Sequence, residues 1–510
     1  MFTQLSLTRF QGFSNKTEIP IRPLTLIFGP NASGKSSLIR SLLLAKQSLG
    51  SVPLISSRRI GFEYEGSEVS LASFANVVFK HDENSSFIIE FGLDCEAEQN
   101  SPSARRFMRN RGSEPRDKTQ INLEEVVEHI SSSWEVSIKK PILSLSINFK
   151  FRTFEKPVQF KFQLINEVST NQELQLTYKL TIENIETLTH LIKRNIASAD
   201  KALEESDYDV RDAIPGNYEG HHGSFKSKFE EEVNYIDEEV FDLQFQVFDN
   251  FVRVSPSSVV DSIFAENLDQ LLSYHSFKVK THLRGIRHIG PLREISKRLT
   301  YDAGTLTTFD DESAEILFEP LENEVANWLF ELTEGRYRLS PIESYLGNAR
   351  FLGTLKSQIL TDTRTGTPVT FQDVGVGLSQ ILPILELVSR ASALKQQTLV
   401  IEQPELHLHP KMQANLVDLF ISFIQKPKSH RTVLLETHSE SMLLRIQKRI
   451  REGSLDPNLV QVIYVDQIPD SPDSPKNEGN FAFALPLDEN GDFIMPMPNS
   501  FSSLRFEDLI

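Results

Sequence analysis

Eight residues near the N-terminus combine glycines, a lysine and a serine at the spacing that phosphate binding requires. Residues 29–36 read GPNASGKS and satisfy the pattern G-x-x-x-x-G-K-[ST]. Backbone N–H groups of such a loop can wrap α- and β-phosphates, Lys35 can reach the β- and γ-phosphates, and the Ser36 hydroxyl can ligate Mg²⁺. The residues expected to contact phosphate are Gly29, Asn31, Ala32, Ser33, Gly34, Lys35, Ser36 and Ser37.

The segments around this loop supply the context that the motif needs. The apolar run at 24–28 predicts a buried strand, and SSLIRSLLLAKQ after the loop has helical spacing of its apolar residues. The glycines therefore fall on a strand-to-helix turn, where the positive end of the helix also attracts phosphate. A chance glycine-rich turn is the alternative.

Three further segments carry chemistry near the C-terminus. In TLVIEQPELHLHP at 398–410, a β-branched strand ends in Glu402, which is placed to hold Mg²⁺ directly or through water. In RTVLLETHSESML, a second buried strand ends at Thr437 and His438, whose imidazole would face a γ-phosphate, unless the histidine is only structural. The loop of FQDVGVGLSQILPILELVSR precedes a helix that should begin near Ser379, so it offers a second helix N-terminus for anions or simply a tight turn.

The order of these elements resembles that of ABC-type ATPases: a glycine-rich signature loop, a helix, a Walker B strand and a switch histidine. Within that superfamily, EQPELHLHP and THSE resemble the overcoming-lysogenization-defect (OLD) class and the ATPase subunits of bacterial antiphage defence systems, including the Septu type. The resemblance covers roughly residues 1–95 and 286–466. It implies an α/β ATPase head of mixed sheets with flanking helices, assembled from N- and C-terminal lobes.

The resemblance also implies a head-to-tail homodimer, or a higher oligomer, in which ATP lies between the loop of one protomer and the signature loop of another. The residues that would contact the γ-phosphate in trans are Gly375, Gly377, Ser379 and Gln380. The sequence departs here from the usual Leu-Ser-Gly-Gly-Gln, so the residue in the serine position stays open.

A second departure concerns the attacking water. The residue after the Walker B carboxylate is usually a glutamate in this class, whereas this chain has Gln403. An amide can orient water but cannot accept its proton, so we expect slow hydrolysis rather than none. Glu405 is a candidate substitute base if the chain stays extended, as Pro404 favours; a salt bridge or helix cap is the alternative.

His407 and His409 would share one face of an extended segment and so invite a metal interpretation. No cysteine or carboxylate cluster with ligand spacing accompanies them. We therefore favour a loop that communicates between the two nucleotide sites of a dimer, as in ABC-type ATPases.

Composition limits the class of protein. The chain has 510 residues, with 53 Lys and Arg against 70 Asp and Glu, so its formal charge is −17 and no global positive field indicates nucleic acid. A local contact remains open at the five arginines around Phe107, although a solvated loop is the alternative. The single cysteine, Cys95, excludes an internal disulfide and fits a small buried hydrophobe. No signal peptide or apolar run of membrane-spanning length is present, so we expect a cytoplasmic protein.

The predicted organisation has four parts. These are an ATPase N-lobe at 1–95, an inserted arm at 96–285, an ATPase C-lobe at 286–466, and a tail at 467–510 with a hairpin turn at Asn490 and Gly491. In the arm, period-two alternation at 144–154, 158–165 and 174–182 predicts antiparallel strands, followed by an acidic helical stretch at 186–241. Arg293, at the return into the C-lobe, is a candidate for sensing phosphate or a partner.

The sequence therefore favours an ATPase that dimerises or oligomerises around Mg-ATP and controls a separate effector, most plausibly a nuclease in antiphage defence. The segment after Gln467 is too short for the nuclease domain of OLD proteins, so we expect any nuclease to be another chain. The alternatives are a repair or maintenance ATPase that resembles SMC proteins, and an ATP-gated scaffold without turnover. Missing heptads and the acidic balance disfavour the SMC-like alternative, whereas Gln403 supports the scaffold.

Overall fold

The computed structural model describes most of the chain, and its described residues form two compact units. Unit 1 comprises Met1–Glu18 and Arg40–Arg284, and unit 2 comprises Ile19–Ile39 and Gly285–Ile510. The described residues are 1–51, 55–56, 59–60, 62–95, 123–137, 143–170, 173–184, 186–192, 194, 245–248, 251–254, 263–291, 293, 300–302, 318–345, 354–371, 373–392, 396–427, 430–467 and 479–496.

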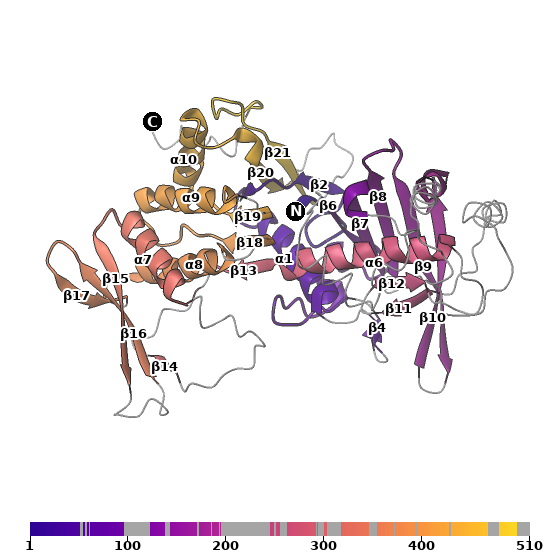
Figure 1. The fold of residues 1–510 in the computed structure, drawn as a ribbon, viewed down its shortest axis with the longest axis horizontal. Helices are drawn as coiled ribbons and strands as arrows, with labels where there is room; N and C mark the ends of the chain where they lie inside the picture. Colours follow the sequence, from indigo (N-terminus) through magenta and orange to yellow (C-terminus); the bar gives the residue numbers. More distant parts are fainter. Residues whose placement is uncertain are drawn as a thin grey trace, which may run out of the picture. The chain divides into compact units, whose positions relative to one another are not determined.

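Unit 2 is built on a six-stranded sheet of order β13-β18-β19-β3-β20-β21 (Figure 1). Its strands are β13 (Ile286–Ile289), β18 (Gln396–Glu402), β19 (His430–Glu436), β3 (Leu24–Phe28), β20 (Val460–Gln467) and β21 (Asn480–Leu485). Every neighbouring pair is parallel except β20 with β21. Because parallel strands end at the same edge, the residues after β3, β18 and β19 come together there.

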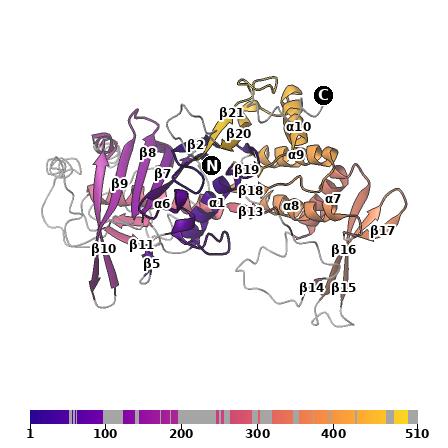
Figure 2. The same cartoon turned by 180° about the vertical axis from the view of Figure 1, so that it is seen from behind.

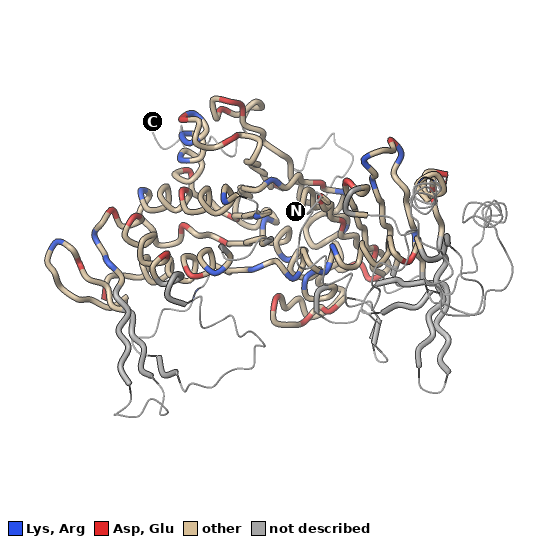
Figure 3. Tube along the Cα trace, in the orientation of Figure 1, with Lys and Arg blue, Asp and Glu red and all other residues tan. Residues whose placement is uncertain are grey.

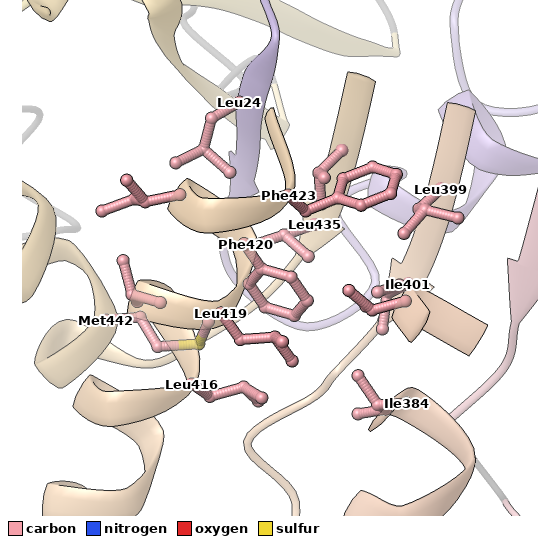
Figure 4. Close-up of a cluster of buried hydrophobic side chains, with 14 of the residues drawn as sticks. Leu24, Ile384, Leu399, Ile401, Leu416, Leu419, Phe420, Phe423, Leu435 and Met442 are labelled. Atoms are coloured by element: carbon pink, nitrogen blue, oxygen red, sulfur yellow. The ribbon is translucent and has the colours of Figure 1, made fainter. Parts of the chain in front are cut away.

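Helices cover this sheet because its strands are apolar on both faces. They are α7 (Phe318–Leu332), α8 (Val376–Ser392), α9 (Pro410–Ile424) and α10 (Glu440–Arg451), whose side chains share one core with the strands. α1 (Lys35–Ala45) follows the loop after β3 and has its residues 35–39 in unit 2 and the rest in unit 1. Figure 4 shows side chains from β3, β18 and β19 meeting those of α8, α9 and α10, with Phe420 near the centre. The alternate strand residues, such as Val400 and Leu434, are equally buried and face the opposite side of the sheet.

An ion-pair network joins α9 to α10. The Asp418 carboxylate accepts hydrogen bonds from the guanidinium groups of Arg445 and, at 2.7 and 2.8 Å, of Arg449. Burial opposes ionisation of Asp418, but these two partners outweigh it and lower its pKa. The two helices that begin just after the Glu402 and His438 turns are thereby tied to each other.

A smaller sheet completes unit 2. It pairs β14 (Thr300–Asp302), β15 (Tyr337–Tyr345) and β17 (Thr367–Thr370) with β16 (Thr354–Asp362), always antiparallel. The segment after β21 turns at Asn490 and Gly491, as the sequence predicts, and it is closed by an isolated bridge between Leu487 and Phe493 and by backbone hydrogen bonds rather than by two paired strands. β21 instead pairs with β20, because β20 would otherwise be the open edge of the sheet.

Unit 1 is organised around a seven-stranded sheet of order β10-β9-β8-β7-β6-β1-β2 (Figure 2). Its strands are β1 (Phe2–Thr8), β2 (Thr17–Pro20), β6 (Ser86–Asp94), β7 (Val127–Ser137), β8 (Leu143–Phe151), β9 (Val158–Thr170) and β10 (Glu173–Glu183). The antiparallel strands predicted for the arm are confirmed as β8 to β10. They share one sheet with β1 and β6 from the first 95 residues, a continuity that sequence alternation cannot reveal.

Several further elements complete unit 1. They are the π-helix Lys46–Ser51, the hairpins β4 (Ile55–Ser56) with β5 (Arg59–Ile60) and β11 (Phe245–Phe248) with β12 (Phe251–Val254), the 3₁₀ turns Phe74–Asn76 and Phe79–His81, α3 (Leu123–Val126) and α6 (Ile263–Arg284). α6 contributes His275, which is 1% exposed, stacks on Trp134 and shares a 2.7 Å hydrogen bond with Ser132. Burial lowers the pKa of His275 to about 3, so the ring is neutral at pH 7.

The mixed α/β class predicted from the sequence is confirmed. Cys95 is buried as expected, and burial raises the pKa of its thiol to about 11, which leaves it unreactive. The arginines around Phe107 and most of the acidic stretch at 186–241 lie outside the described residues. The four-part domain division remains a proposal. Within the described part of the chain, no helix is long and apolar enough to cross a membrane.

Candidate nucleotide site

The glycine-rich loop lies between β3 and α1 in unit 2, on the strand-to-helix turn that the sequence predicts. Gly29 and Gly34 have φ of +148° and +101°, and Ala32 has φ of +60°, so the backbone repeatedly enters the left-handed region. A Cβ at Gly29 would also collide with the backbone carbonyl oxygen of Val465. Gly29 is therefore required by conformation and by space.

Lys35 is folded against this loop. Its ammonium donates to the carbonyl oxygens of Gly29 at 3.0 Å and Pro30 at 2.6 Å, and only 4% of the residue is exposed. Burial lowers its pKa, although the nearby carboxylates of Glu436 and Glu405 oppose that effect. The Lys35 ammonium, which the sequence predicts to contact phosphate, is thus held at the loop by hydrogen bonds within the same chain.

The other predicted phosphate contacts divide by exposure. Asn31 and Ala32 are exposed, whereas Ser33 and Ser37 are buried. The Ser33 hydroxyl has no hydrogen-bond partner among the described residues. It is therefore a donor available to a ligand of this loop, consistent with the predicted contact.

Two strand-end carboxylates lie beside the loop. Glu402 and Glu436 are register partners at the ends of β18 and β19. The Ser36 hydroxyl donates to both carboxylate oxygens of Glu436, at 3.1 and 3.0 Å, while Glu402 accepts from His288 Nε2 at 2.7 Å. Burial and then the charge of Glu402 raise the pKa of Glu436. A carboxylate absent from the predicted set, Glu436, thus makes the direct contact with Ser36.

These oxygens fit the magnesium ion that the sequence predicts. Mg²⁺ prefers hard oxygen ligands and normally keeps several waters and substrate phosphates, so two carboxylates and a serine hydroxyl suffice from the protein. Among the described residues, no group of three or more His, Cys, Asp or Glu side chains is arranged as a metal site by itself. Ser36, Glu402 and Glu436 are the residues that would hold the ion.

Gln403 occupies a strained turn after Glu402. Its φ is +45°, and its N–H donates to the Glu436 carbonyl oxygen at 2.7 Å. On the other side, Arg293 Nη2 donates to the carbonyl oxygens of Glu402 at 2.7 Å and Gln403 at 3.2 Å. The backbone that presents Gln403 is therefore fixed by contacts from two other segments.

Glu405 points back toward the switch turn. Its Oε1 accepts the N–H of His438 at 2.7 Å, whereas its buried Oε2 has no partner among the described residues. Only 9% of Glu405 is exposed, and burial raises its pKa, although the hydrogen bond from the His438 backbone opposes that effect. A buried carboxyl with a raised pKa and a free oxygen is suited to proton transfer.

The histidines separate into distinct environments. His438 is exposed, and burial of part of its ring, followed by the charge of Lys35, lowers its pKa. His409 is the N-cap of α9, where its Nδ1 accepts the N–H of Lys411. His407 is exposed with φ of +61°. The metal interpretation of His407 and His409 gains no support from the described residues.

The helix that follows the predicted signature loop begins earlier than the sequence predicts. α8 begins at Val376, three residues before Ser379, because the left-handed turn at Gly375 ends the preceding loop. Ser379 is 1% exposed and its hydroxyl donates to the Val376 carbonyl, while the 7% exposed Gln380 donates to the Arg293 carbonyl. Gly375 is the exposed member of the predicted set and Gly377 is half-buried.

The chain matches a known protein family over a range that contains the motifs described above. Residues 1–443 match the family AAA_15, described as an AAA ATPase domain, and the chain belongs to this family. No curated protein matches the chain.

Three solved structures are similar to the chain over nearly their whole length. They are an SMC head bound to the C-winged helix domain of ScpA, an SMC head domain from Thermotoga maritima, and an SMC head domain with an extended coiled coil bound to the C-terminal domain of ScpA derived from Pyrococcus furiosus. Their identities are 11, 10 and 12%, and their TM-scores are 0.40, 0.35 and 0.34. The aligned regions cover 96, 96 and 95% of this chain and 98, 99 and 96% of those chains.

Proposed function

We propose that the chain binds Mg-ATP at the loop 29–36, hydrolyses it slowly and, in the ATP-bound state, assembles into a dimer that regulates a separate effector. The observation that carries this proposal is the hydrogen bond between Ser36 and Glu436, next to the register partner Glu402. It brings the loop and two strand-end carboxylates to one place, as a Mg-nucleotide site requires. When bound, Mg²⁺ would offset the negative charge of the phosphates.

Hydrolysis would use the groups around Gln403. The oxygen of a water attacks the γ-phosphorus, the bond from that phosphorus to the bridging oxygen of ADP breaks, and the water proton passes to a carboxylate before it reaches the phosphate. Gln403 would orient the water, and Glu405, with its free Oε2, would accept the proton. His438 would donate to the γ-phosphate.

Slow turnover would make the ATP-bound state long-lived. Glu405 already accepts the His438 N–H, so it is less available than a glutamate at position 403 would be. The same contact favours the second candidate, an ATP-gated scaffold without turnover. Measured phosphate release distinguishes the two, since only the ATPase releases phosphate at a rate that depends on Lys35.

Dimer formation would use the exposed start of α8. Val376 is 49% exposed and lies between Gly375 and Gly377, so a partner could reach it. A partner's γ-phosphate would meet the free N–H groups at this helix N-terminus. The effector that we propose, by resemblance to the OLD and Septu ATPases, is a nuclease of an antiphage defence system.

The first test removes the phosphate-binding charge. Lys35→Ala should abolish equilibrium binding of labelled ATP, because the loop loses its only ammonium group. Lys411→Ala, which changes an exposed lysine of α9, is the control and should bind ATP normally. Unchanged ATP affinity in Lys35→Ala would contradict the assignment of this loop.

The second test addresses the dimer. Val376→Glu adds a negative charge where a partner's phosphate is expected, so it should prevent ATP-dependent dimerisation in light scattering while ATP binding by the monomer persists. Leu444→Glu changes an equally exposed leucine on α10 and should leave dimerisation intact. We prefer Val376 to Gly377, because a Cβ at Gly377 would collide with the His407 carbonyl within the same chain. Normal dimerisation of Val376→Glu would refute this interface.

The effector is tested by reconstitution. If the neighbouring reading frames encode a nuclease, its cleavage of plasmid DNA should depend on this chain and on ATP. DNA binding by the chain alone, with no effect on such a nuclease, would instead favour the SMC-like alternative.

A further inference from the structure

Arg293 occupies a position in unit 2 that phosphate binding does not explain. Its Nη2 is committed to the carbonyl oxygens of Glu402 and Gln403, at 2.7 and 3.2 Å. The sequence suggests a phosphate or partner sensor, whereas these contacts are to the backbone of the same chain. The side chain therefore holds the backbone of the turn that follows the Walker B strand by these two hydrogen bonds.

The backbone of the same residue contacts α8. Gln380, in the second turn of that helix and 7% exposed, donates from Nε2 to the Arg293 carbonyl oxygen at 2.8 Å. One residue thereby connects the helix that follows Gly375 with the turn that carries Gln403. These two segments follow one another in the chain, whereas Arg293 is distant in sequence from both, and side chains of α8 and β18 also share one core.

Arg293 also stabilises an unfavourable conformation. Gln403 has φ of +45°, a region that is unfavourable for a residue with a side chain unless its surroundings hold it there. The Arg293 guanidinium donates to the Gln403 carbonyl oxygen on one side, the Gln403 N–H donates to the Glu436 carbonyl oxygen on the other, and together they supply that restraint. A movement of Arg293 would therefore shift the backbone that carries the Gln403 side chain.

The charges around Arg293 favour contacts with groups of its own chain. Burial lowers the pKa of Arg293, and the carboxylates of Glu405 and Glu402 oppose that effect, so the guanidinium lies among acidic groups. Its Nε and Nη1 have no hydrogen-bond partner among the described residues. A planar group with several donors can hold two carbonyls at once, which a shorter lysine does less well.

We infer that Arg293 is a positioning residue, which couples the start of α8 to the Gln403 turn so that a change at one end of the contact is transmitted to the water-orienting residue. This inference rests on the proposed function, because it concerns the same hydrolysis. It adds that the two halves of a shared nucleotide site are linked within each chain through Gln380, Arg293 and Gln403.

The test compares turnover with binding. Arg293→Met should lower the rate of phosphate release at saturating ATP by about 10- to 100-fold, the effect expected when a catalytic group is slightly misplaced. Affinity for labelled ATP should change less than about twofold, and Arg293→Lys should recover part of the rate. Arg390→Met, which removes an exposed arginine from α8, is the matched control and should behave as the wild type.

A double-mutant cycle with Gln380→Leu tests the coupling itself. Both single variants should lose turnover, and Arg293→Met with Gln380→Leu should be little worse than the poorer single variant, because both act through one connection. Thermal unfolding checks that each variant is folded. If Arg293→Met does not fold, Arg293→Lys and Gln380→Leu decide the question.

Two results would overturn the inference. One is wild-type turnover in the Arg293 and Gln380 variants, and the other is a loss of ATP affinity as large as the loss of turnover, which would make Arg293 a nucleotide contact. Failure of the wild type to bind ATP is a different result, since it refutes the proposed function. If the wild type binds ATP without turnover, ATP-dependent dimerisation of the same variants serves as the readout.

Discussion

Replacement of Glu405 by glutamine separates the chemistry of this residue from its structural contact. The glutamine amide oxygen can still accept the His438 N–H that Glu405 Oε1 accepts at 2.7 Å. The variant loses only the charge and the proton-accepting capacity of a residue that is 9% exposed. Because burial disfavours that charge, Glu405→Gln should fold at least as stably as the wild type.

The size of the effect depends on whether Glu405 is the base. A positioned general base contributes roughly 10²- to 10⁴-fold to a rate. This corresponds to about 3–5 kcal/mol of the activation free energy. If Glu405 only holds the switch turn, the glutamine keeps that contact and the rate should change by less than a few-fold. Glu405→Ala would not discriminate, since it also leaves the His438 N–H unpaired, at a cost of about 1–3 kcal/mol.

The assay is steady-state phosphate release at saturating Mg-ATP, with labelled ATP binding measured on the same preparations. Glu489→Gln, a change of an exposed acid in the turn before Gly491, is the control. Gln403→Glu is the complementary variant and should raise the rate, although its new carboxylate must ionise beside Glu402 and Glu436. A fast wild-type rate that survives Glu405→Gln would show that Glu405 is not the base.

Three further predictions concern magnesium, the loop and acid stability. Glu436→Gln should raise the Mg²⁺ concentration required for half-maximal binding of labelled ATP by about 10- to 100-fold, and an unchanged Mg²⁺ requirement would exclude Glu436 from the site. Gly29→Ala should lower the free energy of unfolding by at least about 1–3 kcal/mol, measured by urea denaturation, because its φ of +148° and the Val465 carbonyl both oppose a side chain. His275 has a pKa near 3 when folded, so only the unfolded chain binds its proton between that pH and about 6.5, and stability falls as the pH is lowered through this window by up to about 1.4 kcal/mol per unit. His275→Gln should therefore lose less stability than the wild type between pH 7 and pH 5, and equal losses would contradict this assignment.

Sequence patterns predict the elements that depend on local signals. β3, α1 and the strand ending at Glu402 follow from a loop motif and from runs of apolar residues, and the structure has each of them where expected. Such elements are encoded by neighbours in the chain, so a single sequence suffices to find them.

The remaining features of the site depend on register and on long-range contacts. Glu436 looks like the last residue of a buried strand, and its role emerges only when β18 and β19 align it with Glu402 beside Ser36. A carboxylate at the end of an apolar strand is the signal that would have found it. His288 becomes a partner of Glu402 because β13 joins β18, and the sequence between them gives no hint of that pairing.

The contact at Gly29 has a genetic consequence. The atom that excludes a side chain there is the backbone oxygen of Val465, which every amino acid at position 465 would carry. That backbone belongs to β20, which is paired with β3 on one side and β21 on the other. A selection for suppressors of Gly29→Ala should therefore return glycine itself and no compensating replacement at residue 465.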